Sequence, residues 1–270
     1  MISFCLSADA MALQVRRHAR WISSVRGNLP RNYRFDYGPP GVALAIAHLT
    51  SLRLSDRVVA MTEPMAAQIA RYTGRNSKVI GNFVDEAPLE AFRRSPDPQA
   101  PYTFAFLGNL SLRKQPHVLL DAVRRLVAQG VKLQVDVMGE GPMLAALTET
   151  VQKNDLEKQV TLHGHVMCPY RLLARADALV LPSLSEGMSR AVLEAMQLGV
   201  PAVLRDVDGN RALVHEGRNG LLFARDADLP SAMLEAAELR RKQAACGSLL
   251  PQEFRQGPCA QAFLDLVEAE

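Results

Sequence analysis

Residues 183–201 read SLSEGMSRAVLEAMQLGVP and carry more information about the architecture than any other stretch of the chain. They follow an apolar run at Ala178–Leu181, typical of a buried strand, and their small residues predict a turn before a helix. A helix that begins behind such a turn presents free backbone N–H groups and a partial positive charge. The strand, turn and helix therefore predict a site for an anionic ligand.

Two glutamates, Glu186 and Glu194, stand on either side of the predicted helix start. At 1.5 Å per helical residue, their backbones are at most about 12 Å apart. A nucleotide sugar has about this reach from its sugar hydroxyls to its ribose hydroxyls, and carboxylates accept hydrogen bonds from hydroxyls. The alternative is that Glu186 caps the helix and Glu194 is a solvated helix residue.

The Glu-x7-Glu pattern, followed by AMQLGVPAV at 195–203, resembles the signature of retaining, nucleotide-sugar-dependent glycosyltransferases of family 4. The resemblance covers about residues 78–250 and implies the GT-B fold. In that fold a carboxy-terminal, Rossmann-like domain binds the donor and an amino-terminal one binds the acceptor. The expected reaction is transfer of a sugar from a nucleotide sugar with retention of configuration.

Short β-like runs alternate with amphipathic helical runs along the chain, which indicates an α/β protein with parallel sheets. A polar, Pro-rich segment predicts a linker at 93–101. We therefore expect a partial amino-terminal acceptor-side domain at 1–92 and a complete donor nucleotide-sugar-binding domain at 102–250. A carboxy-terminal helix is expected at 251–270.

The expected strands of the first domain are Trp21–Val25, Arg57–Met61 and Lys78–Ile80. A Rossmann-like domain has about five or six strands, so this domain is predicted to be incomplete. The family's first strands, with their glycine-rich loop, have no counterpart. Three interpretations stay open: an amino-terminally truncated product of a longer gene, a domain completed by another chain, and a degenerate protein.

A basic turn follows the predicted strand Tyr102–Leu107. The resemblance places the phosphate-binding basic residues here, with Lys114 matching the family lysine and Arg113 as its neighbour and helper. The turn begins with Gly108, and Asn109 stands where the family often has arginine. Charge-assisted hydrogen bonds from Lys114 would stabilise the leaving nucleotide, whereas the alternative is a solvated turn lysine.

By the same resemblance Glu186 and Lys114 are the catalytic residues. Glu186 holds the donor-sugar hydroxyls and Glu194 holds the ribose. Three backbone N–H groups bind the phosphate or the sugar, those of Gly187, Met188 and Ser189. The family often has Gly-Phe-Gly at these positions, so Met188 and Ser189 are departures.

Three further groups of residues are candidates for binding a metal ion or the nucleotide base. His165 lies where the family places a strand end beside the nucleotide base. His163, His165 and Cys168 have a spacing conceivable for zinc, but no metal is expected. Asp206-Val-Asp208 resembles the metal-binding Asp-x-Asp of the other large transferase fold, yet its context is that of a loop and we interpret it so.

Arg26 ends the predicted strand Trp21–Val25, four residues before Pro30. Many relatives have His-x-x-x-Pro at this place, with the histidine reaching the donor sugar across the cleft. Arg26 could take a related role near the phosphate or the acceptor, or it could be a surface arginine.

The composition limits the partners. Residues 1–75 carry ten Lys or Arg and four Asp or Glu, so they could meet anionic lipid or an anionic acceptor, or form a solvated basic surface. Aromatic residues make up only 6% and no binding motif accompanies the basic residues, which argues against nucleic acid. Scattered cysteines and short apolar runs predict a cytoplasmic protein, peripheral to the inner membrane face at most.

These observations predict a hexosyltransferase-type enzyme that uses a nucleotide-sugar donor and a glycan or lipid-linked acceptor in surface polysaccharide biosynthesis. It would need no cofactor and no metal. One alternative is a non-catalytic nucleotide-sugar-binding module, which the missing glycine-rich loop and Arg26 favour. Others are a second type of GT-B enzyme, such as a nucleotide-sugar epimerase, and a structural subunit completed by a partner chain.

Overall fold

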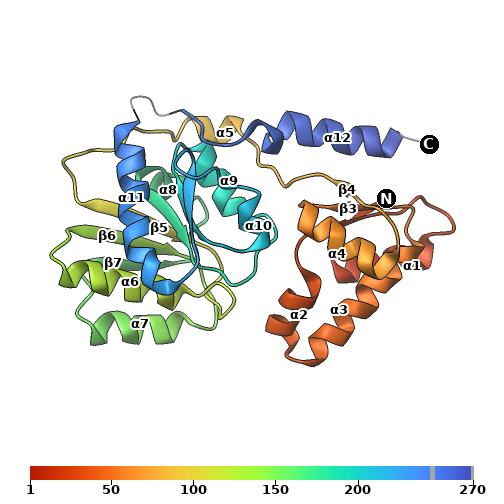
Figure 1. The fold of residues 1–270 in the computed structure, drawn as a ribbon, viewed down its shortest axis with the longest axis horizontal. Helices are drawn as coiled ribbons and strands as arrows, with labels where there is room; N and C mark the ends of the chain where they lie inside the picture. Colours follow the sequence, from red (N-terminus) through yellow and green to blue (C-terminus); the bar gives the residue numbers. More distant parts are fainter. Residues whose placement is uncertain (244–246, 269–270) are drawn as a thin grey trace.

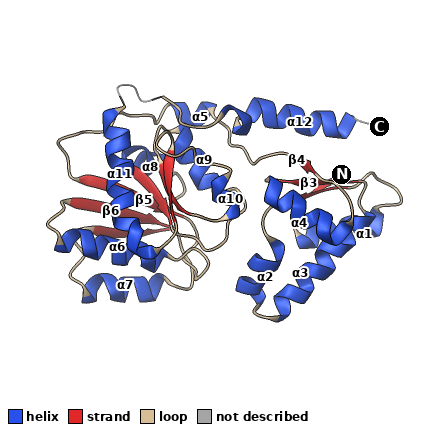
Figure 2. Cartoon of the chain, in the orientation of Figure 1, coloured by secondary structure: helices blue, strands red, loops and turns tan. Residues whose placement is uncertain are grey.

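The computed structural model describes residues 1–243 and 247–268, which form two α/β domains side by side (Figure 1). Each domain is built on a parallel sheet flanked by helices (Figure 2). The expected α/β class is therefore confirmed. Within the described residues, no helix is both long enough and apolar enough to span a lipid bilayer.

The carboxy-terminal domain holds a six-stranded parallel sheet in the order β10-β9-β8-β5-β6-β7. Its strands are β5 (Tyr102–Leu107), β6 (Leu133–Met138), β7 (Val160–Gly164), β8 (Ala178–Leu181), β9 (Ala202–Arg205) and β10 (Gly220–Phe223). The chain winds outward from β5 to β7, returns to β8 beside β5, and then winds outward the other way. Ligands of open α/β sheets bind at such a reversal, outside the carboxyl ends of the strands.

Helices cover both faces of this sheet (Figure 1). On one face α6 packs against α7 and α11, and on the other α9 packs against α8 and β9. Their bounds are α6 (Pro116–Ala128), α7 (Leu144–Lys153), α8 (Tyr170–Arg175), α9 (Arg190–Gln197) and α11 (Leu229–Lys242), with the short α10 (Asp208–Arg211) after β9. Burial on both faces explains why β8 reads as an unbroken apolar run.

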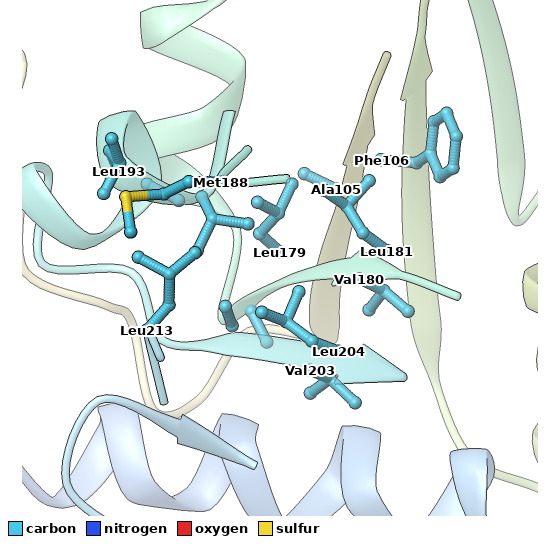
Figure 3. Close-up of a cluster of buried hydrophobic side chains, with 14 of the residues drawn as sticks. Ala105, Phe106, Leu179, Val180, Leu181, Met188, Leu193, Val203, Leu204 and Leu213 are labelled. Carbon is cyan, nitrogen blue, oxygen red and sulfur yellow. The ribbon is translucent and has the colours of Figure 1, made fainter. Parts of the chain in front are cut away.

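Part of the hydrophobic core lies between β8, β9 and α9 (Figure 3). Leu179 and Leu181 of β8 meet Leu204 of β9 and Leu193 of α9, and each of these side chains is fully buried. The core thereby fixes the direction of α9, the helix that follows the glutamate-bearing turn.

The amino-terminal domain has a four-stranded parallel sheet in the order β1-β2-β3-β4, not the three strands expected from the sequence. They are β1 (Ile2–Ser3), β2 (Ile22–Val25), β3 (Arg57–Ala60) and β4 (Lys78–Val79). The additional strand, β1, pairs with β2 over two residues, too short a run to give a periodic signal. Its helices are α1 (Leu6–Val15), α2 (Leu29–Tyr37), α3 (Pro40–Ser51) and α4 (Glu63–Thr73), with α5 (Ala87–Glu90) leading toward β5.

The last helix of the chain, α12 (Gln256–Glu268), returns to the first domain and lies along its sheet (Figure 1). Ile22, Val59 and Ile80 form a buried cluster with Cys259 of α12, while neighbouring strand residues face the other side. The helix expected at 251–270 begins only at Gln256. Proline is tolerated in the first turn of a helix but not further inside, so Pro258 excludes the earlier start.

A buried polar network joins the elements of the first domain. The Asp9 carboxylate lies 2.7 Å from His48 Nε2, and the Tyr33 hydroxyl lies 2.8 Å from His48 Nδ1. Ser3 Oγ donates to Asp9 and accepts from Trp21 Nε1 at 2.7 Å. Burial alone would raise the pKa of Asp9, but hydrogen bonds from His48 and Ser3 outweigh burial and lower this pKa.

Replacing Asp9 by alanine should lower the free energy of unfolding by about 3–5 kcal/mol, because partners of a buried charge lose their acceptor. The lowered folded-state pKa means that the contribution of Asp9 is present above its ordinary value of 3.8 and is lost as the pH falls. Urea unfolding at pH 7 would measure the change. The exposed Asp36→Ala is the control and should change stability by about 0.5 kcal/mol or less; an equal loss in both variants would contradict the role of the network.

Candidate functional site

Two loops meet at the point where the winding of the large sheet reverses. One follows β5 at 108–115 and the other follows β8 at 182–189. The backbone N–H of Leu184 donates to the carbonyl of Arg113 at 2.9 Å. The Arg113 guanidinium in turn donates to the carbonyl of Ser185 at 3.1 Å. Residues 72 positions apart are thus held in one site.

An ion pair joins these loops. Lys114 Nζ lies 2.5 Å from Glu186 Oε1, and the side chains are only 12% and 6% exposed. Burying both charges costs desolvation free energy, so such a pair is weak evidence for a purely stabilising role. It uses one of three ammonium donors and one of two carboxylate oxygens. Both groups therefore keep bonding capacity toward a ligand.

The backbone of the first loop is tightly constrained around Lys114. Gln115, the next residue, has φ +54° and ψ +44°, a left-handed conformation that costs a side-chain-bearing residue free energy. Gly139 after β6 has φ +149°, and a Cβ atom there would lie 1.9 Å from the carbonyl oxygen of Gly108. Asn109 is exposed at the mouth of the loop. These constraints fix the direction of the lysine before any ligand arrives.

Helices α6 and α9 begin directly after the two loops. The strands that precede these loops, β5 and β8, are neighbours in the sheet. Both amino termini, with their free N–H groups and partial positive charge, therefore start at the same edge of the sheet. Ser189 is the residue before α9, and its side chain makes no capping hydrogen bond. The arrangement favours an anion between the two loops.

Both glutamates are buried. Glu194 is 8% exposed and Arg190 lies 3.3 Å away, one turn earlier in α9. Burial raises the pKa of Glu194, and the charge and hydrogen bond of Arg190 lower it only in part. The interpretation of Glu194 as a solvated residue is therefore wrong. Glu186 pairs with Lys114 and does not cap α9, which excludes the capping alternative.

Gly187 lies between two pieces of backbone. A Cβ atom on it would be 2.4 Å from the carbonyl oxygen of Arg26 and 2.5 Å from Met61 Cε, both in the first domain. On the other side, a Cβ atom on Gly209 would lie 1.9 Å from the Gly187 carbonyl oxygen. Only glycines permit this packing, and it sets the loop against the first domain.

The cleft between the domains contains contacts that the sequence did not indicate. Asn82 binds Met188 twice, through its backbone N–H to Sδ at 3.0 Å and through its side-chain amide to the carbonyl at 3.2 Å. Ser185 Oγ donates to Asn32 Oδ1 at 2.8 Å. Met188 therefore contacts the opposite domain. Asn82 follows a strand at the carboxyl edge of the small sheet, a position that could have singled it out.

Arg26 lies at the same cleft, where its guanidinium donates to Asn82 Oδ1 at 3.2 Å. The other predicted residue, His165, is exposed just after β7. Its neighbour His163 is held by Asp136, 2.7 Å from Nε2, and Arg175 binds the same carboxylate. Across 1–243 and 247–268, no three His, Cys, Asp or Glu side chains are grouped closely enough to hold a metal ion.

The Asp-x-Asp segment is not wholly a loop as expected. Asp208 begins the short helix α10, and Asp206 lies 2.5 Å from the guanidinium of Arg211. A hydrogen bond from Arg211, followed by the charge of its guanidinium, lowers the pKa of Asp206. Both acids are therefore engaged by an arginine of their own segment.

Residues 89–248 match the sequence family described as Glycosyl transferases group 1. The chain belongs to this family. It is 30% identical over 185 residues to the putative colanic acid biosynthesis glycosyltransferase WcaL of Salmonella typhimurium, covering 66% of this chain and 41% of that protein. It is 27% identical over 154 residues to the alpha-D-kanosaminyltransferase of Streptomyces kanamyceticus, covering 54% of this chain and 40% of that protein. The matches span about 40% of the length of these two relatives.

Solved structures show the same fold. Anabaena Alr3699/HepE in complex with UDP-glucose superposes with a TM-score of 0.80 at 17% identity, covering 98% of this chain and 78% of that one. A mutant of S. aureus TarM was solved in complex with Fondaparinux, alpha-GlcNAc-glycerol and UDP. It superposes with a TM-score of 0.79 at 17% identity, covering 99% of this chain and 55% of that one. The GT-B fold expected for this group 1 glycosyltransferase chain is thereby confirmed.

Gly209→Ala should lower the free energy of unfolding by about 1–3 kcal/mol, because the added Cβ forces the backbone of the 182–189 loop to move. Urea unfolding measures the change. Gly257→Ala is the matched control, since no atom of another part of the chain lies within 4 Å of its exposed Cβ position in α12, and it should change stability by about 0.5 kcal/mol or less. A neutral Gly209→Ala would show that the loop is not held by this contact.

Glu194→Gln should flatten the dependence of stability on pH. Burial raises the folded-state pKa of Glu194 above 4.5, so the folded protein binds this proton more tightly than the unfolded chain. Ionisation then destabilises the fold, and the free energy of unfolding falls as the pH rises above 4.5. The glutamine variant should lack this contribution and gain stability over wild type between pH 4 and pH 7 in urea unfolding. The control variant at an exposed position, Glu149→Gln, should not gain stability over this range. If the stability of Glu194→Gln changes with pH in parallel with that of wild type, the effect of burial is refuted.

Proposed function

We propose that the chain transfers a sugar from a UDP-sugar to a glycan or lipid-linked acceptor, with retention of configuration, as a family 4 hexosyltransferase of surface polysaccharide biosynthesis. The observation that carries this proposal is the buried Lys114–Glu186 pair at the reversal of the sheet, between two helix amino termini. The solved HepE structure contains UDP-glucose and the solved TarM structure contains UDP, which supports uracil as the base.

The diphosphate would lie between the two loops. Lys114 and Arg113 supply cations, and the amino termini of α6 and α9 supply N–H groups, those of Gly187, Met188 and Ser189 among them. These donors stabilise the charge that develops on the leaving UDP, which is the usual task of fixed donors in transferase sites. We therefore propose transfer that needs no metal ion.

The two carboxylates would recognise hydroxyls at either end of the donor. Glu186, held by Lys114, would accept hydrogen bonds from the sugar, and Glu194 from the ribose. His165, exposed after β7, would lie beside the base. Burial of Glu194 makes a ribose contact strong, because hydrogen bonds strengthen where water is excluded.

The proposed chemistry is a front-face displacement. The bond between the anomeric carbon and the phosphate oxygen breaks, and an acceptor oxygen bonds to the same face of that carbon. The acceptor proton passes to the leaving phosphate, so no separate base is required, and positioning with charge stabilisation supplies the rate. Such an enzyme would work at the cytoplasmic face of a membrane, where the basic first 75 residues could contact anionic lipid.

A second candidate is a nucleotide-sugar-binding module without turnover. Asn109 and Arg26 favour it, since they replace an arginine and a histidine that relatives often use. Donor binding without any release of UDP in the presence of acceptor would favour the module, whereas acceptor-dependent release would favour the transferase.

Thermal unfolding with UDP-, GDP- and ADP-sugars, in EDTA, tests the donor site. The UDP-sugars should stabilise the protein, by about 2.7 kcal/mol at 100 times the dissociation constant, and the GDP- and ADP-sugars should not. Lys114→Ala and Glu186→Gln should each abolish this shift. Lys158→Ala, an exposed lysine on the same domain, should keep it. If no sugar nucleotide shifts the transition, the donor-site proposal fails.

A further inference from the structure

Two arginines, one from each domain, face the same cavity at the cleft. Arg26 directly follows β2 at the carboxyl edge of the small sheet, and Arg190 is the first residue of α9. Together with Asn82 they form the polar side of this cavity. Both arginine side chains are exposed, so a ligand in the cleft can reach them.

The charge of Arg26 is not balanced by an acid. Its guanidinium donates to Asn82 Oδ1 at 3.2 Å and lies over the Phe4 ring, 5.1 Å from the ring centre. Both of these partners are uncharged, and within the described part of the chain no carboxylate forms an ion pair with Arg26. Packing around the guanidinium lowers the pKa of Arg26, and the charge of Arg190 lowers it further. An anion at this position would therefore meet a cation that lacks a counter-charge.

Arg190 keeps most of its hydrogen-bonding capacity. Its Nη2 atom lies 3.3 Å from Glu194 Oε1, and its side chain is 66% exposed. A guanidinium has five N–H donors, and this contact uses one nitrogen. Arg190 can therefore bind an anion in the cavity without giving up Glu194.

Arg26 is fixed beside the loop that would hold the donor sugar. A Cβ atom on Gly187, the residue after Glu186, would lie 2.4 Å from the carbonyl oxygen of Arg26. The guanidinium is linked to the same loop through Asn82, which accepts from Arg26 and donates to the Met188 carbonyl at 3.2 Å. An anion on Arg26 would therefore lie near Gly187 and Met188, where the sugar of the proposed donor begins.

The position favours an anion other than the donor diphosphate. The proposed partners of the diphosphate are Lys114, Arg113 and the amino termini of α6 and α9, all in the second domain. Arg26 belongs to the opposite domain and adds a separate positive charge. Glu186 would not repel a second anion strongly, because Lys114 Nζ lies 2.5 Å from its carboxylate. A guanidinium matches a planar carboxylate with two parallel N–H groups.

From this arrangement we infer that Arg26 and Arg190 bind a carboxylate on the donor sugar, and that the donor is a UDP-hexuronic acid. The inference rests on the proposed function, because it names the sugar class of that donor. A neutral hexose would leave two like charges at the cleft without a counter-ion, whereas a hexuronic acid supplies one. The arginines recognise the carboxylate and not the configuration at C4, so the gluco and galacto acids are both candidates.

Isothermal titration of the full chain in EDTA compares each acid with its neutral counterpart. The pairs are UDP-glucuronic acid with UDP-glucose and UDP-galacturonic acid with UDP-galactose, which differ only in a carboxylate or a hydroxymethyl group at C6. At least one acid should bind about tenfold more tightly than its counterpart, because hydrogen bonds between charged groups are stronger than neutral ones.

Arg26→Gln should remove this preference and bind UDP and the neutral UDP-sugars like wild type, because glutamine keeps N–H donors but carries no charge. Arg190→Gln should reduce the preference as well. Arg34→Gln, at an exposed position of α2 outside the cavity, is the matched control and should keep it. Thermal unfolding without ligand checks that each variant is folded.

The inference is overturned if neither acid binds more tightly than its neutral counterpart, or if Arg26→Gln keeps the preference. It is also overturned if Arg26→Gln weakens UDP binding as much as binding of the acid, since Arg26 would then bind the diphosphate. Binding of UDP without a preference for an acid rejects this inference alone and leaves the proposed function standing. If neither UDP nor any UDP-sugar binds, both are rejected.

Discussion

The backbone contact at Gly187 is the constraint on which the arrangement of the two domains depends. The residue fits between the Arg26 carbonyl and Gly209 because neither glycine carries a side chain. Hydrogen-bonded backbone cannot yield as a flexible side chain does, so the contact fixes the position of the loop at 182–189. Glu186 and Met188 lie on either side of Gly187 and contact different domains. Glu186 pairs with Lys114, and Met188 accepts a hydrogen bond from Asn82.

The second connection between the domains is α12. After α11, Leu249 still bonds to Met196 of the carboxy-terminal domain, and α12 then covers a face of the small sheet that would otherwise expose Ile22, Val59 and Ile80. Gln256 begins this helix with a hydrogen bond from its N–H to Glu86 at 2.8 Å, beside the segment that leads into β5. The first domain is thus stabilised from both ends of the chain, and a change in the angle between the domains must move α12 as well.

The sequence predicted the large sheet well because its strands are buried on both faces. Continuous apolar runs such as Ala178–Leu181 and Tyr102–Leu107 coincide with β8 and β5. It also placed Lys114 and Glu186 in loops that do meet. It could not show β1, which is two residues long, nor that α12 covers the first sheet, because a helix does not encode its distant partner. The cross-domain contact of Met188 was missed for the same reason, since packing between segments far apart in sequence leaves no local pattern.

The buried charges would favour a ligand over water at the candidate site. Lys114, Glu186 and Glu194 are all held at low exposure, and burial raises the pKa of Glu194 because it disfavours the ionised carboxylate. Hydroxyl groups and phosphate oxygens would supply the missing hydrogen bonds, and they would do so in surroundings where each bond is stronger than in water. On the other side of the loop, packing around the guanidinium and the charge of Arg190 lower the pKa of Arg26. Under the proposed function, the hydroxyls and phosphates of a donor would therefore add hydrogen bonds to buried charges that the protein alone pairs only in part.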